Sequence, residues 1–322
     1  MSPDRCPTDP ISGFAAPPAE AGAADLAEAA PPGRSAAAGR RVRTLVFSHA
    51  NSFPASTYRT LFAQWEAAGL QVRAVEKFGH DPRYPVSRGW PHLGRQLAEF
   101  IEHEVAEPAW LVGHSLGGYL SLLAAMRQPR WVRGIVLLDS PLIHGPRAAL
   151  LTAAQRAGLM HRIMPSGISA QRRHLWDSLD QVREHFGAKG KFARWDPQVL
   201  ADYVAHGTEP HAQGRTLAFR REVETDIYNA IHTGLPAALR RRPLHCPVAF
   251  IAGRSSRELK RVGLGATLKL VRGRLSWMEG SHLYPFERPR QTAAEVLRWI
   301  DQFEHEDAAA PAAAVPRERL PA

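Results

Sequence analysis

Short apolar runs alternate with helix-like stretches along most of this chain. Runs rich in β-branched and aromatic residues predict strands at residues 44–48, 71–75, 110–112, 135–138, 248–251 and 275–278. Apolar residues at helical spacing predict helices at residues 58–68, 93–105, 119–126 and 292–303. Strands that alternate with helices are joined by right-handed crossovers, so the pattern predicts an α/β fold with a mostly parallel central sheet.

One long interruption, residues 141–242, separates the fourth predicted strand from the fifth. It contains helical stretches but no alternation typical of strands, which predicts a helical insertion. We interpret the insertion as a cap over a site, because such segments commonly form substrate pockets in open α/β sheets; surface helices without that role are the alternative. Its large aromatic residues either line an apolar pocket or form the packing core of the insertion: Trp176, Phe186, Phe192, Trp195 and Tyr203.

The two ends of the chain differ in composition from its middle. Residues 1–40 are rich in Ala, Pro and Gly, and residues 307–322 are rich in Ala and Pro, so both are predicted to be disordered tails. The folded part then consists of a core, residues 41–140 and 243–306, and the insertion.

Composition narrows the class of protein. With 44% hydrophobic residues the chain can bury a sizeable core, and no run approaches the ~20 apolar residues of a membrane span. The first residues lack the apolar segment of a secretory signal. The only cysteines are Cys6 and Cys246, which argues against a structural disulfide or metal cluster and favours a reducing compartment, so we expect a cytoplasmic protein without a bound metal.

The chain has a formal net charge of +10. Its basic residues are scattered apart from Arg40-Arg41 and residues 240–242, and no nucleic-acid-binding motif accompanies them. We interpret the charge as a solvated surface and expect no nucleic-acid partner.

The most informative motif is GHSLGG at residues 113–118. The predicted strand 110–112 precedes it and the predicted helix 119–126 follows it. A serine on such a sharp strand-to-helix turn projects its hydroxyl towards a cleft, and the glycines two residues on either side of Ser115 provide the small neighbours that the turn needs. The backbone N–H of Leu116, at the start of the helix, is suited to stabilise a developing oxyanion.

Together with two further segments, this motif resembles the α/β-hydrolase superfamily over residues 41–306. SHAN at residues 48–51 follows the first strand, where the family usually has His-Gly and an oxyanion-hole residue. GSH at residues 280–282 follows the last strand, where the family keeps its catalytic histidine. The resemblance implies an α/β-hydrolase fold, with helices flanking the sheet and the insertion in the cap position. His49 and His114 are then expected to brace the scaffold.

The resemblance also implies roles for single residues. Ser115 would be the nucleophile and His282 the base that activates it. The backbone N–H groups of Asn51 and Leu116 would form the oxyanion hole. Ala50 stands where the family usually has glycine.

The acid that should orient the histidine is missing from its usual place. A few residues after the strand 248–251 the sequence has Arg, Ser, Ser and Arg at 254–257, with no aspartate. Two carboxylates could replace it. Asp139 follows the strand 135–138, where some α/β-hydrolases place their acid, although an aspartate there could instead cap a turn. Glu258 lies just beyond the usual position, although it could be an ordinary solvated side chain.

These residues predict a serine hydrolase that cleaves an ester, thioester or amide of a small or medium substrate through an acyl-enzyme, with no cofactor. Acyl transfer, perhydrolysis and carbon–carbon bond hydrolysis on the same fold are alternatives. A non-catalytic binding protein is a further alternative if the acid is truly absent. Oligomeric state and substrate identity do not follow from the sequence.

Overall fold

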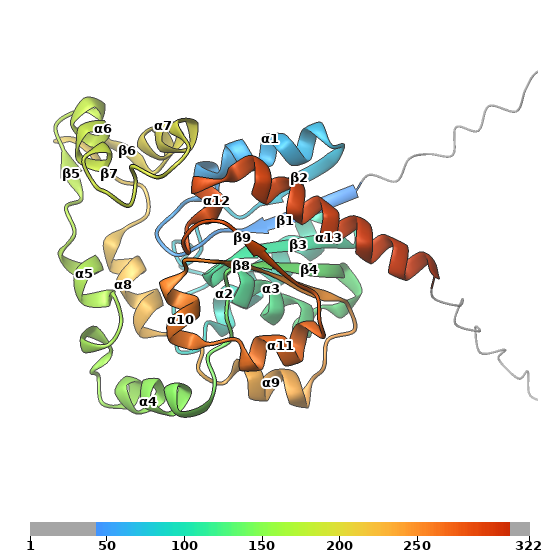
Figure 1. Cartoon of the computed structure of the whole chain (residues 1–322). Helices are drawn as coiled ribbons and strands as arrows, with labels where there is room; N and C mark the ends of the chain where they lie inside the picture. Colours follow the sequence, from blue (N-terminus) through green and yellow to red (C-terminus); the bar gives the residue numbers. More distant parts are fainter. Residues whose placement is uncertain (1–42, 310–322) are drawn as a thin grey trace, which may run out of the picture. The chain divides into compact units, whose positions relative to one another are not determined.

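A computed structural model describes residues 43–309 of the chain (Figure 1). Residues 1–40, which the sequence predicts to be disordered, lie outside this range, and so does Cys6. The predicted C-terminal tail lies outside it from residue 310 onwards. Residues 307–309, expected to belong to that tail, instead form the last turn of the closing helix α13 (Pro289–Ala309).

The centre of the fold is a six-stranded sheet in which every neighbouring pair is parallel. All six predicted strands are present, in the order β2-β1-β3-β4-β8-β9. Their bounds are β1 Arg43–Ser48, β2 Leu70–Ala74, β3 Ala109–His114, β4 Val132–Leu138, β8 Val248–Gly253 and β9 Leu275–Met278. Strands β3 and β8 are buried along their whole length, which explains why they appear in the sequence as continuous apolar runs.

Helices cover both faces of this sheet (Figure 1). On one face, α1 (Arg59–Ala67) and α13 pack together over side chains such as Phe47 and Val112. On the other face, α2 (Pro91–Phe100) and α3 (Leu116–Arg127) pack over the alternate side chains of the same strands, such as Val46 and Leu111. Because successive strand residues point to opposite faces, each strand contributes to both cores.

The insertion between β4 and β8 is mostly helical, as expected. Its elements are α4 (Gly145–Arg156), α5 (Ser166–Gln171), α6 (Leu179–Gly187), α7 (Pro197–His206), α8 (Arg221–Asn229) and α9 (Leu235–Arg241). It also contains a small antiparallel sheet, β5-β7-β6, which the sequence did not predict: Leu175–Trp176, Gly214–Leu217 and Thr208–His211. These strands span only two to four residues, and most of β6 is exposed, so they show no apolar alternation.

The large aromatic residues of the insertion form packing core, one of the two alternatives raised by the sequence. The side chains of Trp176, Phe186, Phe192, Trp195 and Tyr203 are all at most 5% exposed. Their rings contact one another and extend to two rings of the hydrolase core, with Trp195 lying 4.4 Å from Phe286 and 5.7 Å from Phe53 between ring centroids. The insertion therefore shares one hydrophobic cluster with the sheet.

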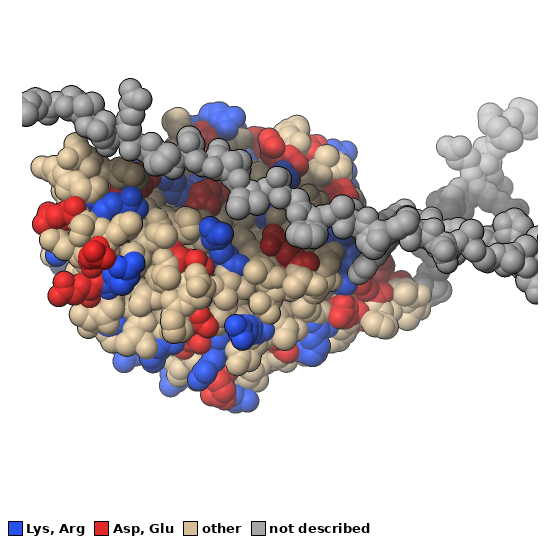
Figure 2. Space-filling model, turned by 90° about the horizontal axis from the view of Figure 1, so that it is seen from above, with Lys and Arg blue, Asp and Glu red and all other residues tan. Residues whose placement is uncertain are grey.

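The surface carries both signs of charge. On the face shown in Figure 2, lysines and arginines are interspersed with aspartates and glutamates over a largely uncharged background. None of the helices within residues 43–309 combines the length and apolar character needed to cross a bilayer.

Candidate active site

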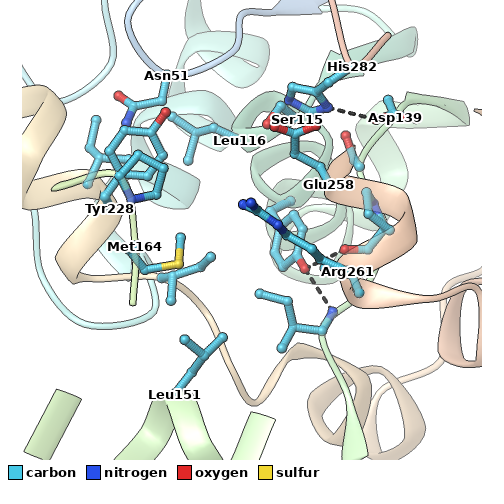
Figure 3. A pocket seen from close by; sticks show the side chains of 18 of the residues that line it. Asn51, Ser115, Leu116, Asp139, Leu151, Met164, Tyr228, Glu258, Arg261 and His282 are labelled. Carbon is cyan, nitrogen blue, oxygen red and sulfur yellow. Dashed lines mark hydrogen bonds and ion pairs between the residues drawn. The ribbon is translucent and has the colours of Figure 1, made fainter. Parts of the chain in front are cut away.

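Ser115 occupies the turn between β3 and α3, at the carboxyl edge of the sheet. Its backbone is in an unusual conformation, with φ +53° and ψ −111°. The turn is held in place because the Ser115 N–H donates a 3.0 Å hydrogen bond to the Leu138 carbonyl of the neighbouring strand. Such backbone strain persists only where the surroundings enforce it, and here it directs the hydroxyl into a cavity that His282 and Asn51 also line (Figure 3).

The glycines of the motif are required by close backbone approach. A Cβ atom on Gly117 would lie 1.9 Å from the Ser48 carbonyl oxygen, and one on Gly113 would lie 2.4 Å from the backbone of Gly117. A Cβ atom on Gly118 would lie 2.3 Å from Ser140 Oγ. The turn therefore fits between β1 and β4 only without side chains at these positions.

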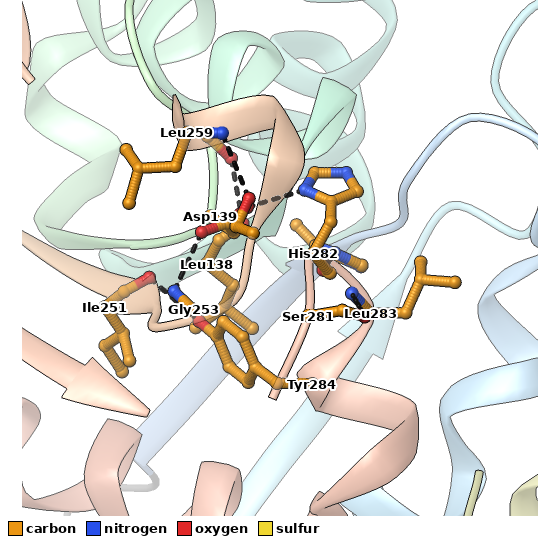
Figure 4. A network of polar contacts seen from close by, with 12 residues as sticks. Leu138, Asp139, Ile251, Gly253, Leu259, Ser281, His282, Leu283 and Tyr284 are labelled. Carbon is orange, nitrogen blue, oxygen red and sulfur yellow. Dashed lines mark hydrogen bonds and ion pairs between the residues drawn. The ribbon is translucent and has the colours of Figure 1, made fainter. Parts of the chain in front are cut away.

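Asp139 directly follows β4 and reaches the ring of His282 (Figure 4). Its buried carboxylate accepts a 2.7 Å hydrogen bond from His282 Nδ1 at Oδ2. The same oxygen accepts a 2.5 Å hydrogen bond from Ser256 Oγ, and Oδ1 accepts one of 2.9 Å from the Gly253 N–H. Of the two carboxylates that the sequence left open, Asp139 is the one in contact with the imidazole.

Glu258 lies on α10 (Arg257–Val262), and its side chain is exposed. It lines the same cavity as Ser115 and His282. Within residues 43–309 its carboxylate forms no hydrogen bond, to His282 or to any other group. Its influence on the imidazole is therefore a longer-range charge effect.

The hydrogen bonds of the pair set its pKa values. Burial alone would lower the pKa of His282, but the hydrogen bond to Asp139 and the negative charges of Asp139 and Glu258 raise it above its ordinary value. Burial would likewise raise the pKa of Asp139, but the bonds from His282, Ser256 and Gly253 lower it. The aspartate is thus ionised, and the histidine is a stronger base than free imidazole.

Ser256 is a site residue that the sequence analysis missed. It occupies the segment where the family usually carries its acid, and there it donates a hydrogen bond to the acid that β4 supplies. Its Oγ also accepts a 3.0 Å hydrogen bond from the Leu259 N–H, which makes Ser256 the N-cap of α10. The serine two residues before a glutamate is a helix-start signal, but nothing in the sequence indicates its second partner.

The two expected oxyanion donors, Asn51 and Leu116, line the same cavity as Ser115. Leu116 is the first residue of α3, where backbone N–H groups have no partner within the helix. Asn51 lines the same cavity, and its side-chain amide donates a 3.0 Å hydrogen bond to the Glu224 carbonyl on α8. The Asn51 side chain therefore connects its loop to the insertion and leaves the backbone N–H as the group suited to an oxyanion.

His114 and the phenol of Tyr58 join three loops of the site. The Ala50 N–H donates to the Tyr58 oxygen (3.1 Å), the Tyr58 hydroxyl donates to His114 Nδ1 (2.8 Å), and His114 Nε2–H donates to the His282 carbonyl (2.9 Å). Burial, with the nearby charge of His282, lowers the pKa of His114 to about 3, so the ring is neutral. These contacts fit the bracing role expected of His114.

His49 is also held in a neutral form. Its Nδ1 donates to the Ala50 carbonyl (2.8 Å), and its Nε2 accepts from the Phe78 N–H (3.0 Å). Burial lowers its pKa to about 4. Both nitrogens are used by the backbone, as expected of a residue that braces the oxyanion loop.

Two cavities of different character meet at Ser115. The first, of about 180 Å³, we call the apolar cavity; its wall includes Leu151, Met164 and Ile231, contributed by the insertion (Figure 3). The second, of about 680 Å³, we call the basic cavity; its wall includes Arg172, Lys191, Arg194, Arg257 and Lys260. The residues common to both are Asn51, Ser115, Tyr228, Glu258 and His282.

Comparison of sequences places these features in a family context. Residues 45–295 match the model of the Alpha/beta hydrolase family. A homoserine O-acetyltransferase from Thermus thermophilus is 33% identical over 182 residues, which are 50% of this chain and 46% of that enzyme. Ethanol acetyltransferase 1 from Hanseniaspora uvarum is 23% identical over 230 residues, 66% of each chain. The match thus spans about half the length of the homoserine O-acetyltransferase.

Solved structures share the architecture. The crystal structure of E-2-(acetamidomethylene)succinate hydrolase superposes with a TM-score of 0.65 at 20% identity, covering 81% of this chain and 91% of that one. A peroxisomal alpha-beta-hydrolase from Saccharomyces cerevisiae superposes with a TM-score of 0.64 at 13% identity, covering 87% of this chain and 81% of the other. At these identities the likeness concerns the fold.

Proposed function

Because this chain belongs to the alpha/beta hydrolase family, we propose that it is a serine hydrolase that cleaves an ester, thioester or amide through an acyl-enzyme. The observation that carries the proposal is the 2.7 Å bond between Asp139 and His282, with Ser115 lining the same cavity as both. A base oriented by a carboxylate, next to a serine on a strained turn, is the arrangement needed to activate a hydroxyl.

In this proposal each step of the reaction has a group to carry it out. His282 Nδ1 is bound to Asp139, so Nε2 is the nitrogen free to take the proton from Ser115 Oγ as the hydroxyl attacks a carbonyl carbon. The backbone N–H groups of Asn51 and Leu116 stabilise the oxyanion. The protonated imidazole then gives its proton to the departing alcohol, thiol or amine. Water attacks the acyl-enzyme by the same route and releases Ser115.

The insertion, residues 141–242, serves in this proposal as the cap that encloses the substrate. Leu151 and Met164 from the cap face Ser115 and Leu116 from the core across the apolar cavity. An enclosed apolar wall excludes water and holds an acyl chain near the nucleophile. The cytoplasmic location stays a prediction from composition.

Acyl transfer to an alcohol is the second candidate. It is favoured by the sequence similarity of this chain to two proteins named as acetyltransferases. It uses the same acyl-enzyme and differs only in the acceptor that attacks it. Product analysis with water and a competing alcohol separates the two. The Asp139–His282 bond supports either reaction over a non-catalytic binding protein, because that alternative depended on a missing acid.

A fluorophosphonate probe tests the nucleophile directly. We expect the full chain to be labelled at Ser115 and the Ser115→Ala variant to lose labelling. A Ser178→Ala variant, which removes an exposed serine that caps α6, should be labelled like the parent chain. An unmodified Ser115, under conditions in which a control serine hydrolase reacts, would contradict the proposal.

A further inference from the structure

The basic cavity is notable for charges that have no counter-ion. Its wall holds five cationic side chains and two carboxylates, Glu224 and Glu258. Two of the cations are paired: Arg172 with Glu224 at 2.6 Å, and Arg194 with Glu287 at 3.5 Å. Among the residues that the structure describes, the other three cations form no ion pair: Lys191, Arg257 and Lys260.

Unpaired cations around a concave wall attract an anion, because the wall focuses their field and partly excludes water. Guanidinium and ammonium groups also match the oxygens of carboxylate and phosphate groups. Desolvation lowers the pKa of Lys191 most, and repulsion from the positive charges of Arg172 and Lys189 lowers it further, while Glu224 and Glu258 act in the opposite direction. An anion bound among them would relieve that repulsion.

The position of His282 bears on which part of a substrate would occupy the basic cavity. Its two chain neighbours, Ser281 and Leu283, line the basic cavity and are absent from the wall of the apolar cavity. In the proposed mechanism His282 gives its proton to the leaving group. His282 itself lines both cavities, so a leaving group that takes this proton in the basic cavity leaves the acyl group in the apolar cavity.

We infer that the substrate is an ester or thioester with an apolar acyl group and an anionic leaving group, whose carboxylate or phosphate binds at Lys191, Arg257 and Lys260. This inference rests on the proposed function of Ser115. Arg147 and Arg261 also line the apolar cavity, so an anion carried by the acyl group is the competing arrangement.

A matched series of thioesters tests the inference. The neutral reference is the butyryl thioester of mercaptoethanol, and the anionic leaving groups are mercaptopropionate and mercaptoethyl phosphate. The competing arrangement is tested with the succinyl thioester of mercaptoethanol, which carries its charge on the acyl group. We expect kcat/KM for at least one anionic leaving group to exceed the reference by about tenfold, since each exposed cation contributes modestly, and to fall as salt is added. The better of the two leaving groups identifies the anion.

The variant Lys191→Ala/Arg257→Ala/Lys260→Ala should bring the ratio of anionic to neutral kcat/KM close to one, and Lys191→Glu alone should lower it. Arg88→Ala removes an exposed cation that lines neither cavity, so it should leave the ratio unchanged. Equal kcat/KM values across the series, or a preference for the succinyl thioester, would overturn the inference. If that turnover still depends on Ser115, the proposed hydrolase function stands. Absence of Ser115-dependent turnover of every thioester would also overturn the inference, and the proposed function would fail with it only if the fluorophosphonate probe leaves Ser115 unmodified.

Discussion

Asp139 is fixed on three sides before it orients the imidazole. The Gly253 N–H holds one carboxylate oxygen, and Ser256 Oγ shares the other with His282 Nδ1. Its own backbone N–H donates a 3.0 Å bond to the Ile251 carbonyl, in a conformation with φ +43°. Because the carboxylate cannot rotate without breaking these bonds, the tautomer and orientation of His282 are fixed as well.

Replacing the acid should separate its role from that of the nearby glutamate. We expect Asp139→Asn to lower kcat by about ten thousand-fold, because the amide favours the wrong tautomer of His282. Glu258→Gln should lower it by no more than about threefold, since an exposed charge acts weakly at a distance. Steady-state kinetics on a neutral ester measures both, with circular dichroism to verify folding; small and equal losses would refute the assignment of Asp139.

The raised pKa of His282 predicts a pH profile. The base must be neutral to accept the proton of Ser115, so kcat/KM should rise with pH and level off only above the ordinary histidine pKa of about 6.5. Glu258→Gln removes one of the charges that raise this pKa, so its acid limb should move to lower pH. An acid limb centred below pH ~6 in the parent chain would contradict the described environment of the ring.

At the scale of elements, the nucleophile depends on how closely α3 approaches β1. Gly117 lies in the first turn of α3, directly against the Ser48 carbonyl. The contact leaves no room for a methyl group, so the start of the helix, and with it the Leu116 N–H, is positioned by backbone packing.

A pair of glycine substitutions tests this contact. Gly117→Ala should lower the free energy of unfolding by about 3 kcal/mol or more and reduce turnover, because α3 must shift. Gly187→Ala, at the end of α6 with open space around it, should change stability by no more than about 1 kcal/mol, in the stabilising direction. Urea denaturation measures the stability of both variants. Equal effects of the two substitutions would show that the close approach of α3 to β1 does not exclude a side chain at position 117.

The sequence predicted the elements that have strong periodicity and missed those that tertiary context creates. The inner strands β1, β3, β4 and β8 were evident because burial on both faces makes them apolar runs. The small sheet of the insertion was not, because a strand such as Thr208–His211 has mostly exposed polar residues. The serine motif predicted Ser115 through local turn chemistry. The choice between Asp139 and Glu258 depended on which strand end faces His282, and the partnership of Asp139 with Ser256 joins residues 117 positions apart.

At the scale of the whole described structure, the insertion and the sheet share an aromatic core. Trp195 of the insertion contacts Phe53 from the loop after β1 and Phe286 from α12 (Tyr284–Glu287). A shared core couples the two parts energetically, so we expect them to unfold together in one transition.

A tryptophan pair tests this coupling. Trp195→Ala should lower the free energy of unfolding by about 3–5 kcal/mol, because it leaves a cavity between cap and core. Trp277→Ala, at a position 42% exposed, should cost less than about 1 kcal/mol. Thermal unfolding followed by fluorescence and by circular dichroism should give coincident transitions; a separate early transition would show that the cap folds on its own.

The chain of hydrogen bonds from Ala50 through Tyr58 and His114 to His282 also restricts how this sequence can diverge. Loss of the Tyr58 hydroxyl alone leaves a buried imidazole nitrogen without a donor, and loss of His114 alone leaves a buried phenol without an acceptor, each costing about 1–3 kcal/mol. Replacing both with apolar side chains removes these two orphaned groups, but it leaves the Ala50 N–H and the His282 carbonyl without their partners. Positions 58 and 114 therefore form an inherited pair: descendants of this gene should keep both residues, because neither a single nor a double apolar replacement satisfies the whole chain of bonds.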